Sequence, residues 1–248
     1  MSIRPLSAVV VIASCSVLFA AGWLARAPEK APAPAVTAPG RKAPSDPTTV
    51  KVAFENVYKN GVWGVNSEGR GTSGSATPIA TRVYRTFLED LLKTAKVRSV
   101  VDAGCGEFGQ SGQIDWTGID YKGFDIVADV INRDKQKHEK PNVHFFVANV
   151  IDYELPPADL LICNYVLQHL PLADVTKFLA KQIPKYRHVL IVNTVDQVTL
   201  TADNHDIVPG SFRPLDITKP PFSIRGTKVL TFFDDPNMQQ VLYFNGHP

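Results

Sequence analysis

The stretch "VVDAGCGEFGQS", Val100 to Ser111, contains three glycines in the spacing Gly104-x-Gly106-x-x-Gly109. The run "VRSVV" leads into it with strand character, and glycines at a strand-to-helix turn let free backbone N–H groups approach a ligand. A second strand pattern ends at Asp125, 21 residues beyond Gly104, where a carboxylate can accept both hydroxyls of a ribose. The stretch therefore predicts a nucleotide-binding loop, with a glycine-rich surface turn as the alternative.

Asp102 stands two residues before the first glycine, where a dinucleotide site usually has an aliphatic residue. Its carboxylate would repel a pyrophosphate, but it would attract a ligand that carries a sulfonium and an ammonium group. The charge favours S-adenosylmethionine as the cofactor. A nicotinamide-dependent oxidoreductase is the alternative enzyme, although no hydride-transfer site is recognisable. A non-catalytic, cofactor-binding interaction module is the alternative outside enzymes.

Short apolar runs alternate with helical patterns through the middle of the chain, which predicts an α/β fold with a Rossmann-like, doubly wound sheet. The expected parallel strands are Ser99–Ala103, Tyr121–Val127, Val143–Ala148, Asp159–Asn164 and His188–Thr194, and the expected helices are 77–95, 130–140 and 172–183. Two further runs, Val229–Phe233 and Val241–Phe244, predict an antiparallel hairpin at one sheet edge. The stretch Asp196–Phe222 is expected to be a long loop.

The string "VVDAGCGEFG" resembles the first motif of class I S-adenosylmethionine-dependent methyltransferases, and the similarity extends from about Phe54 to the C-terminus. "YKGFDIVADVI", "FFVANVIDYELP" and "ADLLICNYVLQHLP" are similar to the motifs at the second, third and fourth strands of that family. The segments "VYKNGVWG…TSGSAT" and "GSFRPLDITKPPF" are similar to flanking elements of a bacterial-type subgroup whose substrate is undefined. We therefore expect a transferase that methylates a small-molecule, lipid-linked or glycan acceptor.

The resemblance also implies the residues of the cofactor site. It assigns Asp102, Gly104, Cys105 and Gly106 to the methionine end, Asp125 and Ile126 to the ribose, Asn149 and the Val150 backbone to the adenine, and Asn164 to closure of the pocket. The family often has Asp where Asn149 stands, but Asn can still accept from the adenine amino group. The connection from Gly109 to Thr117 is short, so its helix should span only one or two turns.

His169, in "LQHLP", is the candidate general base, because its ordinary pKa suits proton transfer and it follows the fourth strand. The alternative is a turn histidine hydrogen-bonded to the backbone. His205, with Asp206, would face the substrate from the long loop or be solvated. Arg213 would bind an anionic substrate group or pair with Asp216.

Tyr58, Trp63 and Ser73 precede the first expected helix, and such segments can fold over a cofactor as a lid. The alternative makes Trp63 a packing anchor. Net charge is +2 with Lys and Arg scattered among acids, so nothing indicates nucleic acid as a partner. Three cysteines without CxxC or HExxH spacing predict neither a disulfide framework nor a metal site.

Residues 1–26 form a separate segment, because no charge occurs between Arg4 and Arg26 and Leu6–Leu24 is almost continuously apolar. That length is close to the roughly 20 residues that span a bilayer. We expect a single-pass N-terminal transmembrane helix that anchors the chain to a membrane, with a cleaved signal peptide and a secretory location as the alternative. Flanking Lys and Arg favour a cytoplasmic catalytic domain. Residues 27–47 are an Ala/Pro-rich linker, and the folded domain is expected at 48–248.

Overall fold

The computed structural model describes residues 45–66, 69–72, 81–234 and 236–245. The chain divides into two units, Met1–Gly40 and Arg41–Pro248, and all described residues belong to the second. The expected membrane segment and Ser73 lie outside the described residues. Within the described ranges, no helix has the length and apolar character needed to cross a membrane.

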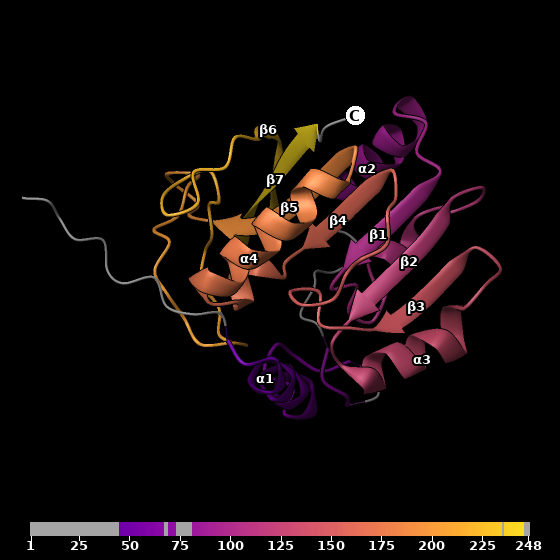
Figure 1. Cartoon of the computed structure of the whole chain (residues 1–248), viewed down its shortest axis with the longest axis horizontal. Coiled ribbons are helices and arrows are strands. Elements are labelled where there is room, and N and C mark those ends of the chain that lie inside the picture. Colours follow the sequence, from indigo (N-terminus) through magenta and orange to yellow (C-terminus); the bar gives the residue numbers. More distant parts are fainter. Residues whose placement is uncertain (1–44, 67–68, 73–80, 235, 246–248) are drawn as a thin grey trace, which may run out of the picture. The chain divides into compact units, whose positions relative to one another are not determined.

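A sheet of seven described strands forms the centre of this unit, in the order β3-β2-β1-β4-β5-β7-β6 (Figure 1). The strands are β1 (Ser99–Ala103), β2 (Asp120–Asp125), β3 (Val143–Val147), β4 (Leu160–Asn164), β5 (His188–Val195), β6 (Thr227–Asp234) and β7 (Asn237–Asn245). β1 to β5 are parallel, whereas β7 is antiparallel to both β5 and β6. The predicted Rossmann-like sheet with its antiparallel edge hairpin is confirmed.

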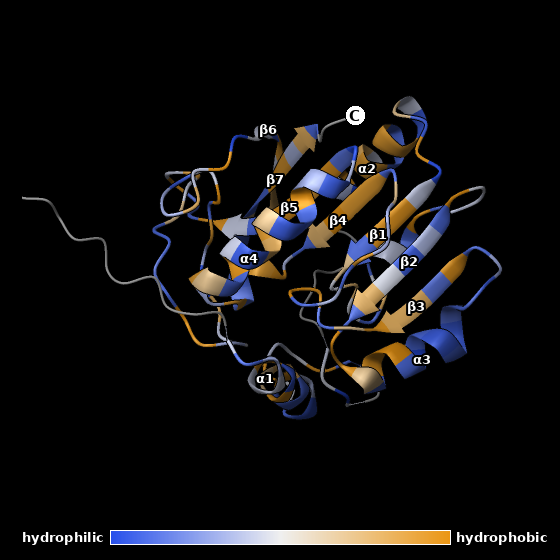
Figure 2. Cartoon of the chain, in the orientation of Figure 1, coloured by the Kyte–Doolittle hydropathy of each residue, from blue (hydrophilic) through white to orange (hydrophobic). Residues whose placement is uncertain are grey.

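The central strands are apolar because helices cover both faces of the sheet (Figure 2). On β4, Leu161 and Cys163 join the core cluster that contains the α4 side chains, while Leu160 and Ile162 join the cluster that contains those of α2. This alternation follows from the two-residue period of a strand. The two clusters cover the two faces of the sheet, so its central strands are fully buried. These packed strands hold the loops at their ends in place.

Four α-helices of the described chain surround the sheet. α2 (Arg82–Thr94) lies behind it, α4 (Leu172–Gln182) crosses in front, and α3 (Ala128–His138) lies beside β3 (Figure 1). α2 begins at Arg82, and the expected start at Thr77 lies outside the described residues. α3 and α4 match the expected helices within three residues at each end.

The helix α1 (Pro47–Lys59) was not predicted, although the sequence contains its signals. The Asp46 side chain accepts a hydrogen bond from the Thr49 N–H, and Pro47 occupies the first turn. Val50, Phe54 and Val57 then recur at helical spacing and are buried. α1 lies beyond the carboxyl ends of β1 to β4 (Figure 1), so it covers the edge of the sheet where a ligand would bind.

The chain reverses its winding direction between β1 and β4, which are neighbours in the sheet. The connection after β1 leads to β2 on one side, and the segment after β4 leads to β5 on the other. At such a switch point the loops diverge and leave a crevice at the carboxyl ends of the strands. The connection from β1 to β2 has only the 3-10 turn Ser111–Gln113, as its short length predicted.

Candidate active site

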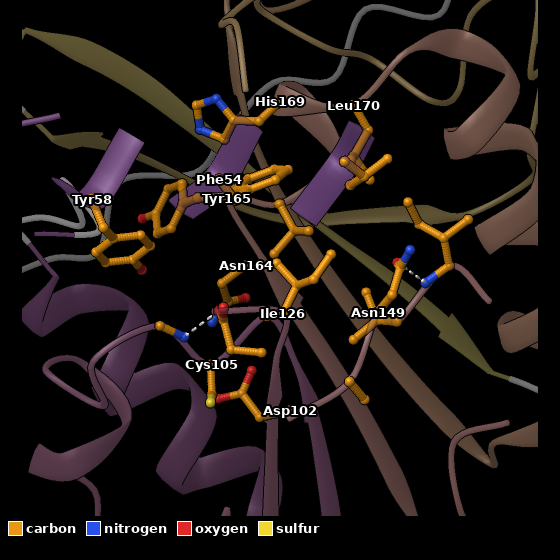
Figure 3. A pocket seen from close by; sticks show the side chains of 18 of the residues that line it. Phe54, Tyr58, Asp102, Cys105, Ile126, Asn149, Asn164, Tyr165, His169 and Leu170 are labelled. Carbon is orange, nitrogen blue, oxygen red and sulfur yellow. Dashed lines mark hydrogen bonds between the residues drawn. The ribbon is translucent and has the colours of Figure 1, made fainter. Parts of the chain in front are cut away.

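An open cleft of about 830 Å³ lies at the switch point between β1 and β4 (Figure 3). Its walls come from the ends of β1, β2 and β4, the segment after β3, and the helix α1. Every residue that the sequence assigned to the cofactor lines this cleft: Asp102, Gly104, Cys105, Gly106, Asp125, Ile126, Asn149, Val150 and Asn164. The structure therefore brings these residues together, and their individual roles stay predictions.

The glycine loop depends on its first glycine for close packing. Gly104 has a φ of 84°, and a Cβ built there would lie 2.2 Å from Cγ2 of Val166. Its N–H and that of Cys105 donate to the carbonyl of Phe124, which ties the loop to the end of β2. Gly109 has no atom within 4 Å of an added Cβ, so the third glycine of the motif has no such packing role.

Asp102 is buried at the floor of the cleft, with 2% of its surface exposed. Oδ2 of its carboxylate accepts hydrogen bonds from the hydroxyls of Ser111 at 2.8 Å and Tyr121 at 2.7 Å. Burial raises the pKa of this carboxyl to about 6, against the lowering effect of the two hydroxyls. Oδ2 of Asp102 accepts both of these hydrogen bonds, so Oδ1 is available to a cationic group of a ligand.

Asp125 is the last residue of β2, and it lines the cleft. Its carboxylate also accepts a hydrogen bond from the glycine loop. Its Oδ2 accepts from the Gly106 N–H at 3.2 Å and its Oδ1 from the Val127 N–H at 2.9 Å. Burial raises the pKa of this carboxyl, and the backbone N–H groups oppose that rise. The remaining lone pairs of the two oxygens are the acceptors that a ribose diol needs.

Asn149 and Asn164 are both partly engaged within the protein. The Asn149 amide donates to Asp152 at 2.8 Å, and its oxygen accepts from the Ile151 N–H at 3.1 Å, so this side chain mainly shapes the turn after β3. Asn164 Oδ1 accepts from the hydroxyl of Tyr84 at 3.1 Å, and its amide is left for a ligand. The adenine would therefore be recognised chiefly through the backbone near Val150.

His169 is buried and lines the cleft, and its ring contacts two aromatic side chains. Its centroid is 4.3 Å from that of Trp63 and 5.8 Å from that of Phe212. Nδ1 is 2.9 Å from the Ser211 carbonyl, which can only accept, so Nδ1 carries the proton. Burial lowers the pKa of His169 to about 4, so the ring is neutral near pH 7 and Nε2 keeps its lone pair.

Two of the proposed substrate residues do not line the cleft. His205 is exposed in the long loop, where its N–H donates to the Asp203 carbonyl. Arg213 is buried and donates from Nη1 to the Leu170 carbonyl at 2.7 Å. Of the two alternatives for Arg213, the pairing with Asp216 is wrong: Asp216 instead accepts hydrogen bonds from Thr201, Thr218 and Lys228.

The predicted lid residues Tyr58 and Trp63 do reach the cleft, but they do so as part of a helix and the turn that follows it. Trp63 packs edge-on against Phe54 and Tyr58, so it serves as a packing anchor as well as a wall of the cleft. Sequence reasoning missed Val50, Phe54, Gln110, Ser111 and Tyr165, all of which line the cleft. The helical spacing of Val50 and Phe54 was the available signal.

The residues present fit S-adenosylmethionine. The buried acids Asp102 and Asp125 match its ammonium and ribose groups, and the crowded glycine loop leaves a backbone surface that a ligand can approach. The strand order, the loop after β1 and the acid that ends β2 are those expected of a class I methyltransferase fold.

Comparison with known proteins also points to a methyltransferase fold. Residues 101–182 match the family described as "Methyltransferase domain". Together with the fold, this match supports a class I S-adenosylmethionine-dependent methyltransferase, as the sequence resemblance implied. No curated protein sequence matches the chain significantly.

Solved structures of methyltransferases share the fold at low sequence identity. Magnesium protoporphyrin IX methyltransferase (ChlM) from Synechocystis PCC 6803, with bound SAH, is 14% identical with a TM-score of 0.55, covering 80% of this chain and 98% of that one. The N-methyltransferase NodS from Bradyrhizobium japonicum WM9, in complex with S-adenosyl-L-homocysteine, is 13% identical with a TM-score of 0.58, covering 78% and 100%. These likenesses concern the fold.

The raised pKa of Asp102 gives a pH prediction for ligand binding. Below pH 6 the carboxyl is largely protonated and cannot attract an ammonium group, and above pH 6 it is ionised. The affinity for S-adenosylhomocysteine should therefore rise about tenfold between pH 5 and pH 7. Calorimetric titration across this range measures it. In Asp102→Asn the affinity should be low and nearly independent of pH; a pH dependence that survives this substitution would assign the effect to another group.

Proposed function

We propose that this domain transfers a methyl group from S-adenosylmethionine to a small, mainly apolar acceptor that carries no anionic group. One observation carries the choice of acceptor: Phe54, Tyr58, Trp63 and Tyr165 supply aromatic wall to the cleft, while no Lys or Arg of the described chain lines it. The cofactor already brings one carboxylate into the cleft, and an anionic acceptor would add a second anion beside the buried carboxylates without a compensating Lys or Arg of the described chain. The proposal narrows the broader expectation of small-molecule, lipid-linked or glycan acceptors.

When bound, the cofactor supplies a methyl group that is already activated on a sulfonium. The protein's contribution is alignment, which is worth up to roughly 7–11 kcal/mol of the barrier. Oδ1 of Asp102 would hold the ammonium group, and Asp125 would accept both ribose hydroxyls. Gly104 and Gly106 expose backbone to the ligand, and α1 excludes water from the apolar side of the cleft.

His169 stays the candidate base, because its neutral ring lines the cleft and has an unprotonated Nε2. Nε2 of Gln168 donates a long hydrogen bond of 3.5 Å to that nitrogen. A pKa of about 4 makes the ring a weak base. The contacts with Trp63 also give His169 a role in holding the cleft wall.

We also propose that residues 1–26 tether the domain to a membrane, with the domain on the cytoplasmic side. The uncharged apolar run Leu6–Leu24 and the basic residues after it support this arrangement. Membrane fractionation tests it: the full chain should remain with the membranes in high salt and in alkaline carbonate, and should be released only by detergent. Recovery of a shortened chain in the secreted fraction would instead support a cleaved signal peptide.

Calorimetric titration of the purified full-length protein, in mild detergent, tests the cofactor. We expect binding of S-adenosylmethionine and S-adenosylhomocysteine, and none of NADH. Binding of NADH alone would replace the methyltransferase with an oxidoreductase. A folded protein that binds none of the three ligands would support an interaction module without a cofactor.

A further inference from the structure

Two buried polar groups that line the cleft have no hydrogen-bond partner within 3.5 Å among the described residues. They are the hydroxyl of Tyr165 and the amide nitrogen Nε2 of Gln110. An unpaired buried polar group destabilises the protein. A ligand in the cleft that formed hydrogen bonds with both groups would remove that destabilisation.

The two groups belong to the segments that flank the methionine end of the cofactor site. Tyr165 directly follows Asn164 at the end of β4, with a strained φ of 60° (Figure 3). Gln110 directly precedes Ser111, whose hydroxyl donates to Asp102. Burial raises the pKa of the Tyr165 hydroxyl, and the Gln110 side chain lowers it, so the two side chains lie beside each other. Both residues line the same cleft as those assigned to the methionine end of the cofactor.

The hydrogen-bonding chemistry of Tyr165 and Gln110 favours some methyl-accepting groups over others. Nε2 of Gln110 can only donate, so its partner needs a lone pair. An ammonium has none, and a neutral amine must direct its single lone pair at the methyl group. A carboxylate or phosphate would face Asp102 and Asp125 with no Lys or Arg of the described chain in the lining. A hydroxyl oxygen has two lone pairs, one for the Gln110 amide and one for the methyl group.

We propose that Tyr165 and Gln110 form the polar end of the acceptor subsite and bind a hydroxyl group on a flat aromatic molecule. Phe54, Tyr58 and Trp63 provide the apolar wall against which its ring packs. An aromatic hydroxyl has a pKa near 10, and two donors to its oxygen favour its ionised form. This inference rests on the proposed methyltransferase function and names its substrate class.

The reaction is then an O-methylation. The acceptor oxygen forms the new C–O bond with the methyl carbon as the S–C bond breaks, and the electron pair of that bond stays on the sulfur. The sulfonium becomes a neutral thioether. The hydroxyl proton leaves to water by way of Nε2 of His169, the candidate base that lines the cleft. The products are an aryl methyl ether, S-adenosylhomocysteine and a hydrated proton.

A pair of probes isolates the hydroxyl group: 4-methylphenol and toluene, each titrated by NMR against the full-length protein saturated with S-adenosylhomocysteine. We expect 4-methylphenol to bind about five- to tenfold more tightly than toluene, as one or two net hydrogen bonds allow. Tyr165→Phe and Gln110→Leu should each reduce that preference to twofold or less and leave toluene binding unchanged. The control Tyr153→Phe removes an exposed hydroxyl outside the cleft and should keep the full preference.

Methyl transfer from labelled S-adenosylmethionine gives the second readout: 4-methylanisole should form from 4-methylphenol, and no product should form from 4-methylaniline. Equal binding of the two probes, methylation of the aniline, or no methyl ether overturns the inference. A tenfold loss of S-adenosylhomocysteine affinity in Tyr165→Phe or Gln110→Leu also overturns it, since the pair would then bind the cofactor. Failure of the unaltered protein to bind S-adenosylhomocysteine would refute the proposed function itself.

Discussion

Replacing Asp125 with alanine should weaken the binding of S-adenosylhomocysteine by about 100-fold or more. Each ribose hydroxyl would lose a hydrogen bond to a charged acceptor, and such bonds are worth about 1.5–3 kcal/mol each. The substitution also removes the acceptors of the Gly106 and Val127 N–H groups, which loosens the glycine loop. Calorimetric titration of the full-length variant measures the loss.

Asp125→Asn is the matched control, because it keeps the shape of the side chain and one acceptor oxygen. We expect an affinity between those of the unaltered protein and the alanine variant. Thermal unfolding of both variants should show that the domain still folds, since burial already disfavours the ionised carboxyl. An alanine variant that binds within threefold of the unaltered protein would refute the assignment of Asp125 to the ribose.

The second large effect is expected for Gly104→Ala, which should abolish measurable cofactor binding and lower the thermal stability. A left-handed φ costs a non-glycine residue roughly 1–2 kcal/mol. The added Cβ would also lie 2.2 Å from Cγ2 of Val166, so the loop or the segment after β4 must move. Both segments line the cleft, and the displacement therefore reaches the cofactor site directly.

Gly109→Ala provides the control within the same motif. A Cβ at this position has no atom within 4 Å, so we expect binding and stability close to those of the unaltered protein. The double variant Gly104→Ala, Val166→Ala should recover part of the stability, because it removes the clash and leaves the backbone strain. If Gly104→Ala and Gly109→Ala had the same effect, the close contact between Gly104 and Val166 would not explain the need for glycine at position 104.

The sequence predicted the sheet because its signals are local. Runs such as "LLIC" and "VLIV" are apolar throughout, as a strand covered on both faces must be, and they became β4 and β5. The hairpin of β6 and β7 was also visible as two neighbouring runs. α1 was missed because the adjoining Ala/Pro-rich stretch was extended as far as Pro47, and the cap formed by Asp46 was read as part of the linker.

The sequence by itself determined the cofactor half of the site, since a glycine loop and an acid at the end of the next strand keep a fixed separation along the chain. The residues of the proposed acceptor half were visible only in the tertiary structure. Phe54, Gln110 and Tyr165 come from segments far apart in the sequence, and all three line the cleft at the carboxyl ends of the strands. The tertiary structure also separated Arg213 from Asp216, since hydrogen-bond partners depend on distances in space that spacing along a chain does not fix.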